Sequence, residues 1–281
     1  MPETPLYIPA TDGALFGVLH EPDPPGPARA AALLLGPGLD EKRAAYGTLA
    51  RLARTLAAGG CRALRFDCRG TGDSAGDSVE TSLSSMERDA ADAAAFLRAR
   101  AGDGAPLALV GFRLGASLAL RLGAALGAAR VAAVAPVAGG SGWLRQERGR
   151  SALRRSMIAR ELAAAAATSG AGALSSPSTG EPAAALPDGA AEDLGGLAVG
   201  ARLVEELSAL DLSAGSPAAD GPETLIVQVS PRRSPLPEVA RLADRFRARV
   251  ECLNIEPFWQ PLENPDPGPL AELLRTFVCG G

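Results

Sequence analysis

Histidine and lysine are almost absent from this sequence. Of its 281 residues one is a histidine, His20, and of its 28 basic residues only Lys42 is a lysine. A single histidine limits any chemistry that depends on an imidazole as general base. Aromatic residues make up only 4% of the chain, whereas 47% of it is hydrophobic. Alanine and leucine must therefore fill most of a sizeable core.

Several other signals are missing. No two of the four cysteines have the C-x-x-C spacing of a zinc knuckle or redox motif. The N-terminal residues lack the basic and apolar regions of a signal peptide. No apolar run reaches the roughly 18 residues that a membrane-spanning helix needs. The net charge of -4 gives no support for nucleic-acid binding. We therefore expect a cytoplasmic protein with reduced thiols, no transmembrane segment, no metal and no cofactor.

Buried strands alternate with helices along most of the chain. Unbroken apolar runs such as Ala30 to Leu35 are typical of strands covered on both faces of a parallel sheet. Strands are expected at 15–19, 30–35, 61–66, 107–110, 131–137, 224–229 and 250–255. Helices are expected at 46–58, at 84–100 with a capping box at Ser84 and Glu87, and before 126, then at 143–167, 237–248 and 270–278. This alternation predicts an α/β fold with a mostly parallel, doubly wound sheet.

The alternation is interrupted once, which predicts an inserted cap. Residues 1–140 would form the N-terminal part of the core, 141–220 the helical cap insertion, and 221–281 the C-terminal part of the core. Within the cap, segment 168–196 consists of Ala, Gly, Ser, Pro and a few acids, so we expect it to be flexible.

An arginine occupies an unusual place in the chain. The apolar strand ending at Val110 runs through Gly111-Phe112-Arg113-Leu114-Gly115 into an Ala- and Leu-rich helix. This is the strand–turn–helix context of the G-x-S-x-G nucleophile elbow, with Arg113 at the position of the serine. A guanidinium stays protonated and has no free lone pair, so it cannot attack a carbonyl carbon.

The layout resembles the α/β-hydrolase superfamily over nearly the whole chain. Gly36-Pro37-Gly38 looks like an oxyanion loop, and Arg65 to Ser74 is similar to the family's F-D-x-R-G-x-G-x-S turn. A narrower resemblance, to exosortase-system-associated hydrolases, rests on the elbow, on Pro136 to Gly140 and on Pro257-Phe258-Trp259-Gln260. That resemblance implies a bacterial exosortase or exopolysaccharide locus as context.

The three positions of a catalytic triad carry unsuitable residues. In this superfamily the acid follows the strand at 224–229, where the chain has Ser230 to Ser234 without a carboxylate. The histidine follows the last strand, where Glu256 to Gln260 contains none. His20 is expected to be half-exposed on an edge hairpin, far from the elbow. We therefore expect none of these positions to be catalytic, Arg113 at the elbow included, and the protein to be noncatalytic.

Arg113 would lie at the positive end of a helix dipole and needs an anion. In one interpretation a protein carboxylate pairs with it, the candidates being Asp40, Glu41, Glu256 and Glu263. In the other, the anion belongs to a small ligand or acyl-type substrate. The predicted ligand-binding residues are Gly36, Pro37, Gly38, Arg113, Leu114, Arg232, Phe258, Trp259 and Gln260. A hydrolase or acyltransferase with a nonstandard mechanism on an ester or thioester is the alternative function.

The remaining candidates have ordinary structural interpretations. Cys68 is expected to be a small buried residue, although nearby arginines could lower the pKa of its thiol. Ser117 should point into the helix packing, and Asp67 should brace its turn. The arginines of 143–167 form either a solvated face or a lid that attracts anions or anionic lipid. A homodimer is a further possibility for this chain.

Overall fold

An eight-stranded sheet forms the centre of the molecule. The computed structural model describes residues 2–23, 25–102, 104–168, 190–215, 220–260 and 266–280. The sheet has the order β1-β2-β4-β3-β5-β6-β9-β10, and its strands are β1 (Glu3–Ala10), β2 (Gly13–His20), β3 (Ala31–Leu35), β4 (Arg62–Phe66), β5 (Leu107–Phe112), β6 (Arg130–Val134), β9 (Glu223–Val229) and β10 (Arg249–Leu253). All strand pairs from β4 to β10 are parallel, whereas β2 pairs antiparallel with both β1 and β4. The predicted α/β sheet is confirmed, and β1, for which no residue range was predicted, pairs with β2 in the edge hairpin that was expected to carry His20.

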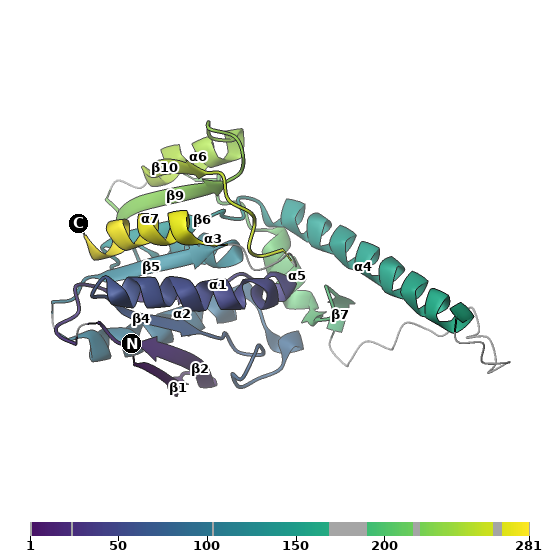
Figure 1. Ribbon diagram of the computed structural model, residues 1–281, viewed down its shortest axis with the longest axis horizontal. Coiled ribbons are helices and arrows are strands. Elements are labelled where there is room, and N and C mark those ends of the chain that lie inside the picture. Colours follow the sequence, from purple (N-terminus) through teal and green to yellow (C-terminus); the bar gives the residue numbers. More distant parts are fainter. Residues whose placement is uncertain are drawn as a thin grey trace.

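Helices cover both faces of this sheet (Figure 1). One face packs against α1 (Leu39–Ala58) and α7 (Gly268–Cys279). The other packs against α2 (Leu83–Ala101), α3 (Leu114–Leu122) and α6 (Pro237–Phe246). Along β3 the side chains alternate between these two cores, so that Leu34 faces α1 while Leu33 and Leu35 face α2. All five residues of β3 are buried, as its apolar sequence predicts.

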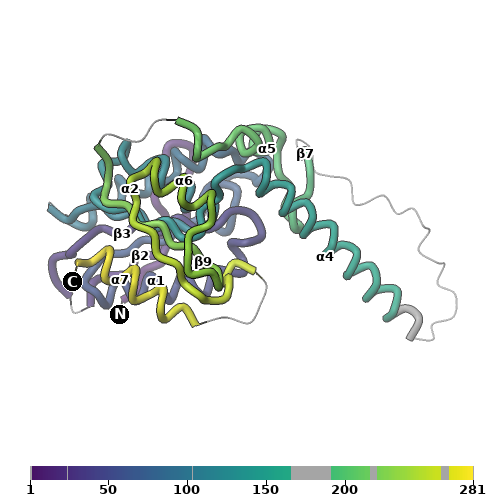
Figure 2. The backbone as a smooth tube through the Cα atoms, turned by 90° about the horizontal axis from the view of Figure 1, so that it is seen from above, coloured from purple at the N-terminus to yellow at the C-terminus, as the bar shows by residue number. Residues whose placement is uncertain are grey.

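The insertion between β6 and β9 is dominated by one long helix. It consists of α4 (Gly140–Thr168), the antiparallel pair β7 (Ala190–Asp193) and β8 (Ala198–Gly200), and α5 (Ala201–Ser208). Figures 1 and 2 both show the C-terminal half of α4 extending away from the body. Most of the predicted flexible segment lies outside the described residues. No helix in the described part of the chain is long and apolar enough to cross a membrane.

Two local expectations need correction, and one short element was not predicted. Helix α1 begins at Leu39, seven residues before the predicted start, because its first turn carries Asp40 and Glu41, which suit a helix N-terminus. The capping box of α2 is formed by Ser82 and Ser85 rather than by Ser84 and Glu87. A short 3-10 turn, Ser78–Glu80, precedes it.

The expectation of reduced thiols is also wrong for one pair of cysteines. Cys61, before β4, forms a disulfide with Cys279, the last residue of α7. The two residues are 218 positions apart in sequence, so no spacing motif could indicate the pair. Cys68 and Cys252 are free cysteines.

Candidate functional site

The loops that carry the candidate residues meet at one edge of the sheet. Strands β3, β5, β6 and β9 are parallel, so the segments after their carboxyl ends lie together. In open α/β sheets this edge is where ligands bind. It brings the Gly36 to Gly38 loop, Arg113, and Ala135 to Gly139 next to one another.

Arg113 forms a sharp turn between β5 and α3. It is the N-cap residue of α3 and has φ 55° and ψ −117°, a conformation that favours glycine. Its amide donates to the carbonyl of Val134, 2.9 Å away. The flanking glycines are required sterically: a Cβ at Gly111 would lie 2.3 Å from the carbonyl oxygen of Gly115, and one at Gly115 would lie 2.2 Å from that of Leu35. The predicted strand–turn–helix geometry is therefore present.

Backbone strain is concentrated at this edge. Four described residues other than glycine have positive φ, and three of them, Leu39, Arg113 and Ala135, follow β3, β5 and β6 directly or within a few residues. Each such conformation costs about 1–3 kcal/mol and persists only where surrounding contacts enforce it. Strained backbone of this kind gathers at functional sites, and it marks the same edge as the sequence motifs.

The side chain of Arg113 is held by three groups. Its Nε donates to Oε1 and Oε2 of Glu41 at 3.1 and 3.3 Å. One terminal nitrogen donates to the carbonyl of Ala135 at 3.2 Å. The guanidinium carbon lies 5.2 Å from the centre of the Trp259 ring, within cation–π range. Of the four carboxylates predicted as partners, Glu41 is the one observed; Glu256 is exposed, and Glu263 lies outside the described residues.

Glu41 is buried between two arginines. Its side chain is 2% exposed, whereas that of Arg113 is 16% exposed. Arg150 of α4 approaches Oε1 of Glu41 at 3.0 Å and also pairs with Glu147. Burial raises the pKa of Glu41 above its usual value, and the charges of Arg113 and Arg150 oppose that rise without cancelling it. When Glu41 and Glu147 are ionised, the two arginines and two glutamates together carry no net charge.

The arginines of α4 mostly face protein carboxylates. Arg154 pairs with Asp40 at the start of α1, and Arg148 and Arg155 pair with Glu192 and Asp193 of β7. Neither predicted interpretation, a solvated face or an anion-attracting lid, accounts for these contacts. Asp40 and Glu41 of α1 are visible in the sequence as possible partners of these arginines. Only the packing of α4 against α1 shows that Arg154 pairs with Asp40 and Arg150 with Glu41.

The other predicted binding residues are separated by the fold. Phe258 and Trp259 are buried in the core, with the Phe258 ring 5.9 Å from that of Phe112 and 5.1 Å from that of Trp259. They therefore do not form the wall of an open pocket. Arg232 and Gln260 are exposed, and neither lines the groove that contains Arg113.

The predicted oxyanion loop keeps its position beside the turn. Gly36, Pro37 and Gly38 connect β3 to α1, and Gly38 is the N-cap residue of α1. A Cβ at Gly38 would lie 2.7 Å from Cδ2 of Leu114, the first residue of α3. Leu114 itself is buried, so it fills this space instead of presenting a surface to a ligand.

An open groove of about 590 Å³ has Arg113 in its lining. It runs between the loop after β6, the first turns of α4, the end of α5 and the start of α6. Its polar lining includes Arg113, Gln146, Asp211, Glu238 and Arg241. The motifs did not indicate Gln146, Asp211, Glu238 or Arg241, because they come from the cap and from α6 and carry no pattern of their own.

Three residues considered as reactive groups are structural. His20 is fully buried rather than half-exposed, since β2 lies between β1 and β4, and desolvation lowers its pKa to about 4. Ser117 is buried in the packing, as predicted, and its hydroxyl donates to the carbonyl of Val137 at 2.9 Å. Burial raises the pKa of the Cys68 thiol to about 12, opposite to the effect of its arginine neighbour, so no reactive thiolate forms.

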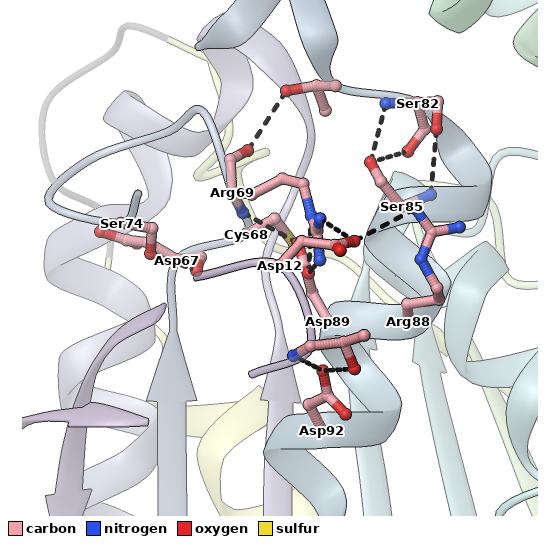
Figure 3. Close-up of polar contacts among 12 residues, drawn as sticks. Asp12, Asp67, Cys68, Arg69, Ser74, Ser82, Ser85, Arg88, Asp89 and Asp92 are labelled. Carbon is pink, nitrogen blue, oxygen red and sulfur yellow. Dashed lines mark hydrogen bonds and ion pairs between the residues drawn. The ribbon is translucent and has the colours of Figure 1, made fainter. Parts of the chain in front are cut away.

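The turn after β4 is braced by ion pairs (Figure 3). Asp89, which is fully buried on α2, accepts hydrogen bonds from the amide of Arg69 at 2.8 Å and from its guanidinium. Hydrogen bonding to Asp89 raises the pKa of Arg69. Asp67 pairs with Lys42, whose Nζ lies 2.7 Å from Oδ1. These contacts give the loop a structural role.

Comparison with known proteins identifies the fold independently. The profile of the alpha/beta hydrolase family matches residues 15–265. Est1E from Butyrivibrio proteoclasticus, with ferulic acid bound, aligns with a TM-score of 0.66 at 14% identity over 97% of both chains.

Two peptidase-related structures are similar to this chain as well. The proline iminopeptidase of Mycobacterium smegmatis aligns with a TM-score of 0.61 at 15% identity, over 98% of this chain and 97% of that one. A proline iminopeptidase-related protein from Thermus thermophilus gives 0.59 at 21% identity over 99% of both. Similarity at these identities shows the fold alone. No curated protein matches the sequence.

Proposed function

The chain belongs to the alpha/beta hydrolase family, and we propose that it is a noncatalytic member in which Arg113 replaces the nucleophile. The observation that carries the proposal is the Arg113–Glu41 pair at the turn between β5 and α3. A protonated guanidinium already bonded to a carboxylate has no lone pair with which to attack a carbonyl. Arg113 at this position holds structure together instead of breaking a substrate bond.

The neighbouring positions support the same proposal. The loop after β9 offers Ser230 and Arg232, and the segment after β10 offers buried Phe258 and Trp259. None of these can accept a proton as histidine does in a triad. His20 belongs to β2, which β4 and β3 separate from β5. Acyl transfer by a serine, histidine and acid therefore has no route through these residues.

We propose further that the chain is related to the exosortase-system-associated hydrolases, because two of the motifs that it shares with them contact each other. Arg113 of the Arg-Leu-Gly-Ala turn stacks on Trp259 of the Pro-Phe-Trp-Gln segment. A cation–π contact of this kind gives a physical reason for the two motifs to occur together. An aromatic ring at this place shields the guanidinium while Glu41 neutralises it.

We propose that the protein binds a small anionic ligand in the groove beside Arg113. Arg113 and Arg241 supply cations and Gln146 supplies an amide, while Asp211 and Glu238 limit the net charge. A carboxylate or phosphate group would therefore have to meet the arginines selectively. Since Glu41 already satisfies the Nε of Arg113, the ligand would use the exposed side of that guanidinium.

Catalysis and binding are tested separately. Short-chain nitrophenyl esters should show no turnover above buffer; turnover that disappears in Arg113→Ala would overturn the noncatalytic proposal. Inorganic phosphate and succinate should raise the unfolding temperature of the wild type and have less effect on Arg241→Ala. Arg232→Ala is the matched control, because Arg232 does not line the groove. Equal stabilisation of all three chains would place any binding elsewhere.

A further inference from the structure

The C-terminal half of α4 carries large apolar side chains that are exposed. Every residue from 155 to 165 is exposed, and Figures 1 and 2 show this part of the helix clear of the body. In the described chain six large hydrophobic residues are exposed, and four lie here: Leu153 62%, Met157 54%, Ile158 49% and Leu162 67%. A helix gains most of its stability in proteins from packing of an apolar face. Within the described part of the chain, these four apolar side chains stay about half exposed or more.

The four apolar residues occupy one half of the helix surface. With 3.6 residues per turn, successive side chains are about 100° apart. Leu153 and Met157 then lie on one side of Arg154 and Glu161, and Ile158 and Leu162 on the other. The opposite half carries the small side chains Ala152, Ser156, Ala159 and Ala163 at its centre and Arg155 and Arg160 at its two edges. The large residues therefore form one surface, which we call the arm face.

The sequence of the arm face has an approximate mirror symmetry about the bond between Met157 and Ile158. Outward from that bond, the pairs are Met157 with Ile158, Ser156 with Ala159, Arg155 with Arg160, Arg154 with Glu161, and Leu153 with Leu162. Apolar matches apolar and small matches small. The pair that combines opposite charges, Arg154 with Glu161, lies in the middle of the face.

We propose that the arm face binds a second copy of this chain, with the two α4 helices antiparallel about a two-fold axis next to Met157 and Ile158. A two-fold contact must be self-complementary, and the mirror symmetry provides this. Arg154 of each copy then lies opposite Glu161 of the other. Met157 and Ile158 of the two copies pack together at the axis.

A cleft beside the middle of α4 has room for the end of the second copy's α4 helix. A cleft of about 1070 Å³ lies between α4 and the β7–β8 pair, lined by Arg154, Arg155 and Ile158 among others. Arg154 pairs with Asp40 and donates to the carbonyl of Gly195 at 3.3 Å, yet 31% of its side chain is exposed. A guanidinium has five N–H donors, so Arg154 can also bind Glu161 of the second copy.

The strength of this contact follows from its size. A single pair of helices crossing over about three turns buries less than a standard interface of roughly 1,600 Å². We therefore expect a dimer that dissociates on dilution in the micromolar range. Sedimentation velocity of the full chain from about 1 to about 100 μM should show the mass rising toward twice that of the monomer.

Two substitutions on the same helix test the arm face. Met157→Glu places carboxylates next to each other at the axis and should weaken the dimer at least tenfold. Ala159→Glu adds the same charge on the opposite half and should leave the dimer unchanged. Both positions are exposed, so circular dichroism should show both variants folded. Equal weakening by the two variants, or a wild type that stays monomeric throughout, would overturn the proposal.

The antiparallel arrangement of the two α4 helices can be tested separately. Glu161→Arg sets arginine against Arg154 of the other copy, so it should weaken the dimer at low salt and less at high salt. Met157→Cys should form a disulfide with its own counterpart under oxidation, while Ala159→Cys should not. A monomeric chain that sediments only with vesicles of anionic phospholipid would assign the arm face to a membrane and refute the dimer.

Discussion

Arg113 and Glu41 should be strongly coupled in the free energy of unfolding. Removing one partner of a buried ion pair costs about 3–5 kcal/mol, because the other charge stays buried. In Arg113→Ala the carboxylate of Glu41, 2% exposed, keeps Arg150 at 3.0 Å. We therefore expect a smaller loss, about 2–3 kcal/mol at neutral pH. For a chain of this size that loss lowers the unfolding temperature by about 4–6 °C.

Replacing the carboxylate instead should cost less. Arg113 is 16% and Arg150 35% exposed, so both can be hydrated once Glu41 is neutral. Glu41→Gln should then cost about 1 kcal/mol or less. Adding Arg113→Ala to Glu41→Gln should remove little beyond the contact with Trp259, worth about 0.5–1 kcal/mol. The two substitutions are thus expected to be non-additive by at least about 1 kcal/mol.

The pH dependence follows from the sign of the Glu41 shift. Because burial raises its pKa, the folded chain binds this proton more tightly than the unfolded chain. The resulting stabilisation is greatest at acid pH and is lost as the pH rises through the raised pKa. Loss of Arg113 raises the pKa further, so the penalty of Arg113→Ala should grow as the pH rises above the ordinary pKa of a glutamate.

Urea and thermal unfolding of the wild type, both single variants and the double variant would measure this cycle. Additivity within about 0.5 kcal/mol would show that the pair is not coupled. A penalty for Arg113→Ala that does not change with pH would refute the electrostatic reasoning, since it would leave only lost packing as the cause.

Three other predictions concern the surrounding structure. Gly115→Ala should cost about 3 kcal/mol or more, because its Cβ would lie 2.2 Å from a backbone oxygen; Gly149→Ala, in a helix with open space around it, should instead stabilise by about 0.5–1 kcal/mol in the same unfolding assay. His20, with its pKa lowered to about 4, should cost stability as the pH falls from about 6.5, by up to about 3 kcal/mol at pH 4, and His20→Gln should flatten that part of the stability curve. Cys68 is partly buried and its pKa is raised to about 12, so it should resist iodoacetamide at about pH 8 in the native chain and react after unfolding; rapid native labelling at this residue would contradict the raised pKa.

Much of the candidate site could be inferred from local sequence. The turn at Arg113 is signalled by glycines two residues to either side, because only glycine permits the close backbone contacts there. Glu41 was one of four carboxylates considered, and nothing in the chain ranked it above Asp40 or Glu256. Arg150 could not be singled out, since six arginines lie along 145–160 and only packing decides which one reaches Glu41.

The sequence alone determined the order of strands and helices and the chemical limits of the turn. Apolar runs bounded by glycine and proline specify buried strands, and an arginine without a lone pair excludes nucleophilic attack wherever it lies. Only the tertiary structure decided that the anion beside Arg113 is Glu41, that Trp259 covers the guanidinium, and that Cys61 meets Cys279. These contacts join residues 72, 146 and 218 positions apart, and at such separations partners are chosen by how the layers pack rather than by local spacing.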